Sequence, residues 1–428
     1  MSQSPIIIIG NGIAGITAAR NIRKNSTDPI LVISKESEYF FSRTALMYVY
    51  MGHLKWEHLL PYENSFWKEN KIDLLFSMVT EISADEKKII LQDGKHLAYS
   101  KLIIATGSTP NKFGWPGQEL EAVQGLYSKQ DLEALEQWSP SIRQATIVGG
   151  GLIGIELAEM LHSRGKKVTF LVRESSFWGN VLSTEEGRLI EKHIIAHGID
   201  LRMNTSLEKI IGDQNKRVQS VITNHEEIIP CEFVGLTAGV RPNIDFLKNT
   251  DLQTKKGILV NKYLQTNLTD IYAIGDCAEL TEPLAHRRPI EAVWYAGRMM
   301  GETVAQTLTK QLTAYRPGHW FNSAKFFDID YQTYGSIHPI ASKNEKHFYW
   351  QHEKENIAMR FAYQPASLSF LGINTFGIRL RHETLNDWLD QKVSIDFVIS
   401  NLHQANFDPE FYTKYEPKIQ KAWINHQN

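Results

Sequence analysis

The 428-residue chain has only two cysteines, Cys231 and Cys277, and neither lies in a C-x-x-C pair or at another metal-ligand spacing. A disulfide framework, a zinc site and an adjacent redox-active cysteine pair are therefore disfavoured, and we expect both thiols to be inert. The histidine in the segment Arg381–Glu383 also lacks a second histidine or acid at ligand spacing. The sequence predicts no metal site.

An excess of one charge and long apolar runs are also lacking. With 46 Lys and Arg against 48 Asp and Glu, the formal net charge is −2, so no positive field favours nucleic acid as a partner. The early apolar run IIIIG follows Pro5 directly and is too short for a signal peptide or a membrane span. We expect a cytoplasmic protein of two or three domains without a membrane span.

An internal repeat is the most informative feature that is present. Two segments, IIIIGNGIAG and ATIVGGGLIG, each place a G-x-G-x-x-G pattern after a β-branched run. The first glycine makes a tight turn, the second lets a pyrophosphate approach the backbone, and the third lets helix and strand pack closely. One such turn is common, but two in strand-turn-helix context predict two dinucleotide sites. The glycines are Gly10, Gly12 and Gly15, and then Gly149, Gly151 and Gly154.

Each copy also carries an acid about 20 residues further on, after its second predicted strand. These acids are Glu36 after ILVISK and Glu174 after VTFLVR, and we expect them to bind ribose hydroxyls. Glu174 favours the free 2′-hydroxyl of NADH, whereas the neighbouring Arg173 could accommodate a 2′-phosphate, so NADPH stays open. A second repeated pair, LIIATGSTP and GLTAGVRPN, is typical of a buried strand that leads into a Gly/Pro turn.

Together these segments resemble the FAD-dependent pyridine nucleotide-disulfide oxidoreductase family over roughly residues 4 to 310. The stretch TNLTDIYAIGDCAE resembles the second FAD signature of that family, which implies that Asp276 hydrogen-bonds the ribityl chain. The following stretch, RRPIEAVWYAGRMMGETVAQ, predicts a helix that starts near Pro289, and the resemblance implies that its N-terminus faces the flavin.

The resemblance implies an α/β fold with two Rossmann-like domains, as in glutathione reductase, and a small α+β C-terminal domain. The expected FAD domain comprises 1–117 and 238–315, the NAD(P) domain 118–237, and the C-terminal domain 316–428. Aromatic-rich segments of the C-terminal domain predict an antiparallel sheet, and the resemblance implies that this domain carries a homodimer contact. The residues implied to contact FAD are Gly10, Gly12, Ala14, Gly15, Glu36, Arg43, Ala105, Thr106, Gly107, Gly275, Asp276, Glu291, Val293 and Trp294. Those implied to contact NAD(P) are Gly149, Gly151, Leu152, Ile153, Gly154, Glu156, Arg173, Glu174 and Gly239.

The stretch YFFSRTALMYVY falls where the disulfide-reductase branch of the family carries its redox cysteines, yet no cysteine precedes Cys231. It is similar instead to the arginine-containing segment of ferredoxin reductases, apoptosis-inducing-factor-like flavoproteins and nitrite reductase flavin domains, with Arg43 and Leu46 matching. It departs from that pattern because Tyr48 stands where a lysine often occurs.

In the family that lysine pairs with a glutamate on the nucleotide-domain helix, which is Glu156 here. A buried carboxylate needs a partner or keeps its proton. Our hypothesis is that Arg43 replaces the lysine and pairs with Glu156 beside flavin N5, so that both residues are catalytic. The alternative is that Arg43 only clamps an FAD phosphate or caps a helix.

The resemblance implies an NAD(P)H oxidoreductase that passes hydride from nicotinamide to flavin N5 without a redox disulfide. Its electrons would go to a carrier such as rubredoxin or ferredoxin, or to a partner reductase. The alternatives are an NAD(P)H:quinone or oxygen reductase and an NADH-sensing flavoprotein with slow turnover. The basic loop His286–Arg288 could steer an acidic carrier, or it could simply be solvated.

Overall fold

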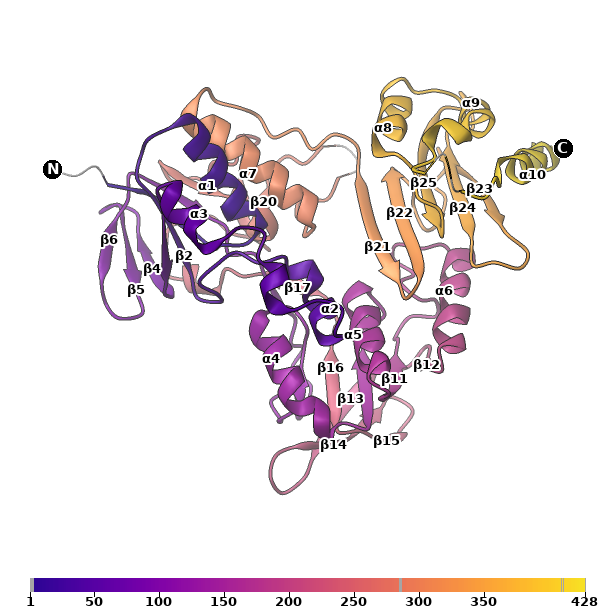
Figure 1. Cartoon of the computed structure of the whole chain (residues 1–428), viewed down its shortest axis with the longest axis horizontal. Helices are drawn as coiled ribbons and strands as arrows, with labels where there is room; N and C mark the ends of the chain where they lie inside the picture. Colours follow the sequence, from indigo (N-terminus) through magenta and orange to yellow (C-terminus); the bar gives the residue numbers. More distant parts are fainter. Residues whose placement is uncertain (1–3, 285–286, 409, 411, 428) are drawn as a thin grey trace. The chain divides into compact units, whose positions relative to one another are not determined.

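The computed structural model describes residues 4–284, 287–408, 410 and 412–427. It forms two compact units, which we call unit 1 and unit 2 (Figure 1). Unit 1 comprises Met1–Ile142, Gln214–Val218 and Gly235–Pro317, and unit 2 comprises Arg143–Asp213, Gln219–Val234 and Gly318–Asn428. The finer division into three domains stays a prediction.

Unit 1 is organised around a parallel five-stranded sheet with the order β19-β7-β1-β2-β3. All four isoleucines of its central strand β1 are buried, because helices and loops cover both faces of such a sheet. The apolar run at the start of the sequence is therefore a core strand. The strands are β1 (Ile6–Ile9), β2 (Ile30–Ser34), β3 (Ile72–Phe76), β7 (Lys101–Ile104) and β19 (Ile271–Ala273).

Helix α1 (Ile13–Asn25) begins directly after the first glycine turn, and α7 (Trp294–Thr309) packs along it (Figure 1). The packing is close because Gly301 has no side chain. A Cβ built on Gly301 would lie 2.5 Å from the carbonyl oxygen of Ala14, well inside van der Waals contact. The two helices thereby fix the edge of the nucleotide-binding fold.

The start of α7 corrects one prediction. The helix begins at Trp294 and not near Pro289, because residues 287–293 form an irregular segment that ends in an extended residue, Val293. The amide of Leu280 donates to the carbonyl of Pro289 at 2.9 Å, and Glu291 is tied to Arg287 by a buried ion pair. Proline at this position fits the irregular segment as well as a first helical turn.

The other elements of unit 1 are short. The stretch that begins at Tyr39 forms a 3₁₀ turn, η1 (Arg43–Ala45), followed by α2 (Leu46–Tyr50). The remaining elements are α3 (Asn64–Glu69), α4 (Lys129–Trp138), an antiparallel sheet of β4 (Val79–Ser83), β5 (Lys88–Leu91) and β6 (His96–Ala98), and the strands β8 (Ser108–Pro110), β9 (Val123–Gln124), β17 (Val240–Pro242), β18 (Ile258–Val260) and β20 (Ala278–Leu280).

Unit 2 contains the second copy of the nucleotide-binding pattern. Its strands β10 (Gln144–Val148), β11 (Lys167–Leu171) and β12 (Asp200–Arg202) pair in parallel, and helix α5 (Leu152–Ser163) follows the second glycine turn. The other elements of this part of the chain are α6 (Thr184–Ala196), β13 (Leu207–Gly212), β14 (Val218–Thr223), β15 (Ile228–Pro230) and β16 (Phe233–Leu236).

The C-terminal part of unit 2 forms the antiparallel sheet that the aromatic-rich segments predict, with the order β21-β22-β25-β24-β23. A buried ion pair connects this sheet to α6: Arg360 of β24 lies 2.9 Å from Glu186, and both side chains are at most 2% exposed. The elements are β21 (Phe321–Phe326), β22 (Ile329–Gly335), β23 (Lys346–Gln351), β24 (Ala358–Tyr363), β25 (Phe370–Phe376), α8 (His382–Asp390), α9 (Ile395–Ser400) and α10 (Glu416–Gln427).

The architecture confirms the predicted fold class, with two nucleotide-binding folds and an α+β C-terminal part. None of the helices in the described part of the chain combines the length and apolar character that crossing a membrane requires.

The contact at Gly301 leads to a stability prediction. Helix propensity alone favours alanine over glycine by about 1 kcal/mol. We nevertheless expect Gly301→Ala to destabilise the protein by about 1–3 kcal/mol, because the new methyl group would overpack the backbone of α1. Thermal unfolding of the FAD-loaded protein measures the change, and Gln306→Ala at an exposed position of α7 is the matched control. A Gly301→Ala protein at least as stable as wild type would contradict the close packing.

Candidate functional site: a dinucleotide cleft in unit 1 and a second glycine turn in unit 2

A cleft of about 1070 Å³ opens in unit 1 beside the carboxyl ends of β1, β2 and β7. This is where ligands bind in open α/β sheets, and the volume is at the upper end of ligand pockets. The cleft brings together most of the residues predicted to contact FAD. They are Gly10, Gly12, Ala14, Glu36, Arg43, Ala105, Thr106, Gly107, Gly275, Asp276, Val293 and Trp294.

The glycines of the first turn differ in the space around them. A Cβ on Gly10, whose φ is +111°, would lie 2.1 Å from the carbonyl oxygen of Ala105, and one on Gly15 would lie 2.0 Å from the carbonyl oxygen of Gly10. A Cβ on Gly12 would meet nothing within 4 Å. The first and third glycines therefore permit backbone packing, while the second leaves open space at the helix N-terminus. The residues present fit a dinucleotide pyrophosphate.

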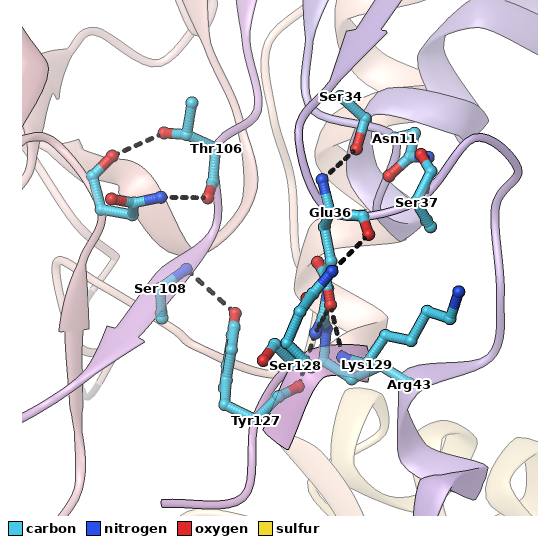
Figure 2. Close-up of polar contacts among 12 residues, drawn as sticks. Asn11, Ser34, Glu36, Ser37, Arg43, Thr106, Ser108, Tyr127, Ser128 and Lys129 are labelled. Carbon is cyan, nitrogen blue, oxygen red and sulfur yellow. Dashed lines mark hydrogen bonds and ion pairs between the residues drawn. The ribbon is translucent and has the colours of Figure 1, made fainter. Parts of the chain in front are cut away.

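Glu36 and Arg43 form a bidentate ion pair at the wall of the cleft (Figure 2). The Arg43 guanidinium donates to the two carboxylate oxygens of Glu36 at 2.7 and 2.6 Å, and to the carbonyl of Tyr127 at 2.5 Å. The amide of Lys129 also donates to Glu36 at 3.0 Å. Although burial opposes the charge, the hydrogen bonds and the charge of Glu36 raise the pKa of Arg43. The carboxylate of Glu36, the acid predicted to bind a ribose, is thus held in place by Arg43.

A second set of polar contacts surrounds Asp276, which lies in a 3₁₀ turn after β19. Its carboxylate accepts a hydrogen bond from the hydroxyl of Ser108 at 2.9 Å. The amide of Ser108 donates to the Tyr127 hydroxyl at 3.0 Å (Figure 2). Burial raises the pKa of Asp276, although the Ser108 hydrogen bond opposes the shift. Tyr127 therefore contacts both parts of the site, through its carbonyl and through its hydroxyl.

Two predicted FAD residues do not line the cleft. Gly15 contributes by packing, and Glu291 is engaged with Arg287, whose Nη2 donates to it at 2.6 Å with both side chains under 10% exposed. This corrects the interpretation of the basic loop, because Arg287 is buried in an ion pair and is not presented to a carrier. Arg288 is exposed, and His286 lies outside the described residues.

The second glycine turn, between β10 and α5, lies in unit 2 and contains Gly149, Gly151, Leu152, Ile153 and Gly154. Gly149 has a φ of +116°, and a Cβ on Gly151 would meet nothing within 4 Å, as at Gly12. Further along, Arg173 donates to the carboxylate of Glu174 at 2.9 Å on the surface. The geometry again fits a dinucleotide pyrophosphate. Gly239 belongs to unit 1, where its carbonyl accepts from the amide of Asn111.

Comparison with known proteins identifies the family of this chain. The family model described as pyridine nucleotide-disulphide oxidoreductase matches residues 4–305. The chain belongs to this family. The family uses FAD and NADH or NADPH, the cofactors that the sequence predicts, and this member is an FAD-dependent NAD(P)H oxidoreductase.

Several relatives are similar over much of their length. The ferredoxin reductase subunit of 5,5'-dehydrodivanillate O-demethylase from Sphingobium sp. is 30% identical, and the match covers 78% of this chain and 82% of the relative. An NADH oxidase of Methanocaldococcus jannaschii is 30% identical, with 70% and 69% covered. The nitrite reductase [NAD(P)H] of Bacillus subtilis is 27% identical over 65% of this chain, which spans about a third (35%) of that relative.

Among solved structures, a NAD-dependent persulfide reductase from A. fulgidus has a TM-score of 0.87 at 24% identity, covering 99% of this chain and 83% of that one. The NADH:rubredoxin oxidoreductase from Clostridium acetobutylicum has a TM-score of 0.73 at 24% identity, covering 93% of this chain and all of that one. At this identity the likeness concerns the fold alone.

Despite the name of the family, no thiol is available at the cleft of this member. Both cysteines are buried, and neither is among the described residues that line the cleft. Burial raises the pKa of Cys231 to about 11, and it also raises the pKa of Cys277, whose thiol donates to the carbonyl of Ile274. Thiols held in the neutral form in this way are poor nucleophiles.

Glu156 lies on α5, two residues after the glycine pattern of unit 2. Burial, together with the nearby carboxylate of Glu159, raises its pKa to about 7. The described partners of Arg43 are Glu36 and Tyr127, within unit 1, whereas Glu156 belongs to unit 2. The pairing of Arg43 with Glu156 stays a prediction.

Sequence reasoning missed three residues that hold this site together. Ser108 directly follows the predicted Gly107, so its position was within reach of the pattern. Tyr127 and Lys129 flank Ser128, the N-cap of α4, whose capping-box pattern predicts a helix start and no cofactor contact. Only folding brings them to Glu36 and Arg43 (Figure 2).

The forked ion pair leads to a prediction for cofactor binding. We expect Arg43→Lys and Arg43→Met each to weaken FAD binding about 10- to 100-fold, because a hydrogen bond to a charged group contributes about 1.5–3 kcal/mol and lysine cannot form the fork. FAD fluorescence on dilution measures the dissociation constant. Arg298→Met, at an exposed arginine of α7 that pairs with Glu302, is the matched control. If Arg43→Lys bound FAD as tightly as wild type, a positive charge at this position would be sufficient for FAD binding and the fork would not be required.

The raised pKa of Glu156 predicts a pH-dependent stability. The ordinary pKa of 4.5 applies in the unfolded chain, whereas the folded carboxyl titrates at about 7. Between these values the folded protein keeps a proton that the unfolded chain releases, so rising pH removes stability from the wild type. Glu156→Gln has no such proton, and its melting temperature relative to wild type should therefore rise between about pH 5 and about pH 8. Glu208→Gln on exposed β13 is the control, and a flat difference for Glu156→Gln would contradict the shift.

Proposed function

We propose that this protein oxidises NADH and passes the electrons from FAD to a small carrier protein of the rubredoxin or ferredoxin type, without a redox disulfide. The observation that carries the proposal is the composition of the cleft. Among its described lining residues there is an arginine at position 43 and no cysteine. A thiol relay to a disulfide substrate therefore has no residue to start from.

Bound FAD supplies a ring that accepts a hydride and gives up electrons. In the proposal, the backbone at Gly12 and the N-terminus of α1 hold the pyrophosphate, and Glu36, fixed by Arg43, receives a ribose. Asp276, held by Ser108, receives the ribityl chain. In unit 2, the turn at Gly151 holds the pyrophosphate of the pyridine nucleotide, and Glu174 favours NADH over NADPH.

The names of the relatives support a protein acceptor. A ferredoxin reductase subunit is 30% identical over most of both chains, and rubredoxin reductases from Pseudomonas putida and Ectopseudomonas oleovorans are 29% and 28% identical.

We also infer a cytoplasmic homodimer. The two free cysteines fit a reducing compartment. Exposed apolar side chains of the C-terminal part, Ile340, Phe397 and Phe407, would contribute to the dimer contact.

A second candidate is direct reduction of dioxygen or a quinone. The similarity to an NADH oxidase, at 30% identity over 70% of this chain, favours the dioxygen version. An NADH-sensing flavoprotein differs from both enzymes in its rate, because it would turn over slowly with every acceptor.

The test compares acceptors and nucleotides on the FAD-loaded protein. We expect anaerobic NADH to bleach the flavin absorbance, and turnover with rubredoxin or ferredoxin to reach the ordinary enzyme range of about 1–10³ s⁻¹, faster than with a soluble quinone or dioxygen. Faster turnover with quinone or dioxygen would favour the second candidate. Slow turnover with every acceptor, together with NADH-dependent dimerisation, would favour the sensor.

Two glycine variants separate the cofactor sites in the same assay. Gly12→Val should lose FAD, because the side chain fills the open space at the first turn. Gly151→Val should keep FAD but lose reduction by NADH, for the same reason at the second turn. Failure of both nucleotides to reduce the flavin of the wild type would overturn the proposal.

A further inference from the structure

Three potential metal ligands meet in unit 2, at the end of α6. His193 lies in the last turn of this helix, His197 is its C-cap, and Asp328 lies in the turn between β21 and β22. One ligand atom from each residue lies within 4.8 Å of the others. The spacing of four residues places both imidazoles on the same face of the helix. The C-terminal end of a helix also carries partial negative charge, which favours a cation.

The hydrogen bonds of His197 leave a nitrogen free to bind a metal. Its Nδ1 lies 2.9 Å from the carbonyl oxygen of His193, which can only accept. Nδ1 must therefore carry the proton, and the lone pair is on Nε2. A backbone carbonyl that fixes the tautomer in this way is the usual outer partner of a metal-binding histidine. The ring is also held by stacking on Phe327, with centroids 4.2 Å apart.

His193 is the most buried of the three, and both of its ring nitrogens have partners. Its Nε2 lies 2.5 Å from Asp328, and its Nδ1 lies 3.0 Å from the side-chain amide of Asn356. An amide can present either its nitrogen or its oxygen after a flip. With the oxygen turned inward, Asn356 would accept the Nδ1 proton and leave Nε2 to a metal.

The turn that carries Asp328 is unusual for its sequence. Phe326 pairs with Ile329, so the turn has two residues, and Phe327 adopts a φ of +55°, which is costly for a bulky side chain. This conformation stacks Phe327 on His197 and brings the carboxylate of Asp328 to His193. Glu159 of α5 accepts from the amide of Phe327, which further fixes the turn.

We propose that His193, His197 and Asp328 bind one divalent transition-metal ion of the Zn²⁺ class, with the remaining position open to water. Two imidazoles and one carboxylate suit zinc and its borderline neighbours. Zinc bonds of about 2.0–2.1 Å place the ligands of a tetrahedral ion about 3.3 Å apart. The Asp328 side chain is 77% exposed, so its carboxylate can move to the distance from the two imidazoles that a tetrahedral ion requires.

Such an ion would cross-link α6 of the nucleotide-binding fold to the β21–β22 hairpin of the C-terminal sheet. Because a ligand that binds only the folded state stabilises it, the ion would raise the stability of unit 2. This proposal differs from the sequence analysis, which predicts no metal site. Its histidines form an H-x-x-x-H pattern, but Asp328 lies far along the chain and joins them only in the fold.

The experiment titrates ZnCl₂ into the untagged, FAD-loaded protein after dialysis against a chelator, with calorimetry as the readout. We expect one zinc ion per chain and a rise in melting temperature with zinc. His197→Asn and Asp328→Asn should each weaken binding more than 100-fold, beyond the 10- to 100-fold effect of losing an outer partner. His225→Asn, at an exposed histidine of unit 2 that contacts the carbonyl of Asn204, is the control and should bind like wild type.

Asn356 provides a second pair of variants at an exposed position. Asn356→Leu should weaken zinc binding about 10- to 100-fold, and Asn356→Asp, which keeps an acceptor for the Nδ1 proton of His193, should retain it. Because the zinc site lies in unit 2 and the flavin cleft in unit 1, an unchanged circular dichroism spectrum of each zinc-free variant, and not its flavin absorbance, shows that unit 2 is folded. Absence of stoichiometric zinc binding to the wild type, or equal binding by His197→Asn and Asp328→Asn, would overturn the site.

Discussion

The close approach of two backbones at Gly10 is the contact on which the cofactor site depends. Because Gly10 lacks a Cβ, the first turn can lie directly against the carbonyl of Ala105 at the end of β7. That contact brings the carboxyl ends of two neighbouring strands together and sets the start of α1. The open space at Gly12 and the positions of Glu36 and Asp276 around the cleft all follow from this arrangement.

Within that frame, Arg43 has a described partner, Glu36, that the sequence pattern did not assign to it. Its guanidinium is committed to Glu36 through two short hydrogen bonds and to the carbonyl of Tyr127 through a third. A guanidinium fork is well suited to hold a carboxylate in one orientation, which an ammonium group does not do. The arginine segment thus places a charge-compensated, hydrogen-bonded Arg43–Glu36 pair at the wall of the cleft.

Local patterns predicted most of the site, and tertiary packing accounts for what they missed. The glycine turns and the acids Glu36 and Asp276 could be placed because each belongs to a continuous strand-turn-helix or strand-turn segment. Tyr127 could not, because it reaches Arg43 only through the packing of the stretch before α4. The predicted start of α7 was wrong because the sequence does not show that Glu291 forms a buried ion pair with Arg287. Asp328 escaped notice for the same reason as Tyr127, since its neighbours are brought to it by the fold.

The buried contact between Arg360 and Glu186 has a consequence for how unit 2 comes apart. Separating the C-terminal sheet from α6 would break this ion pair and the hydrogen bond from Asn374 of β25 to Glu186. Local opening of either part alone is therefore penalised relative to opening of both. The nucleotide-binding fold and the C-terminal sheet of unit 2 should behave as one cooperative foldon, with amide protons in α6 and β24 exchanging with solvent through the same unfolding event.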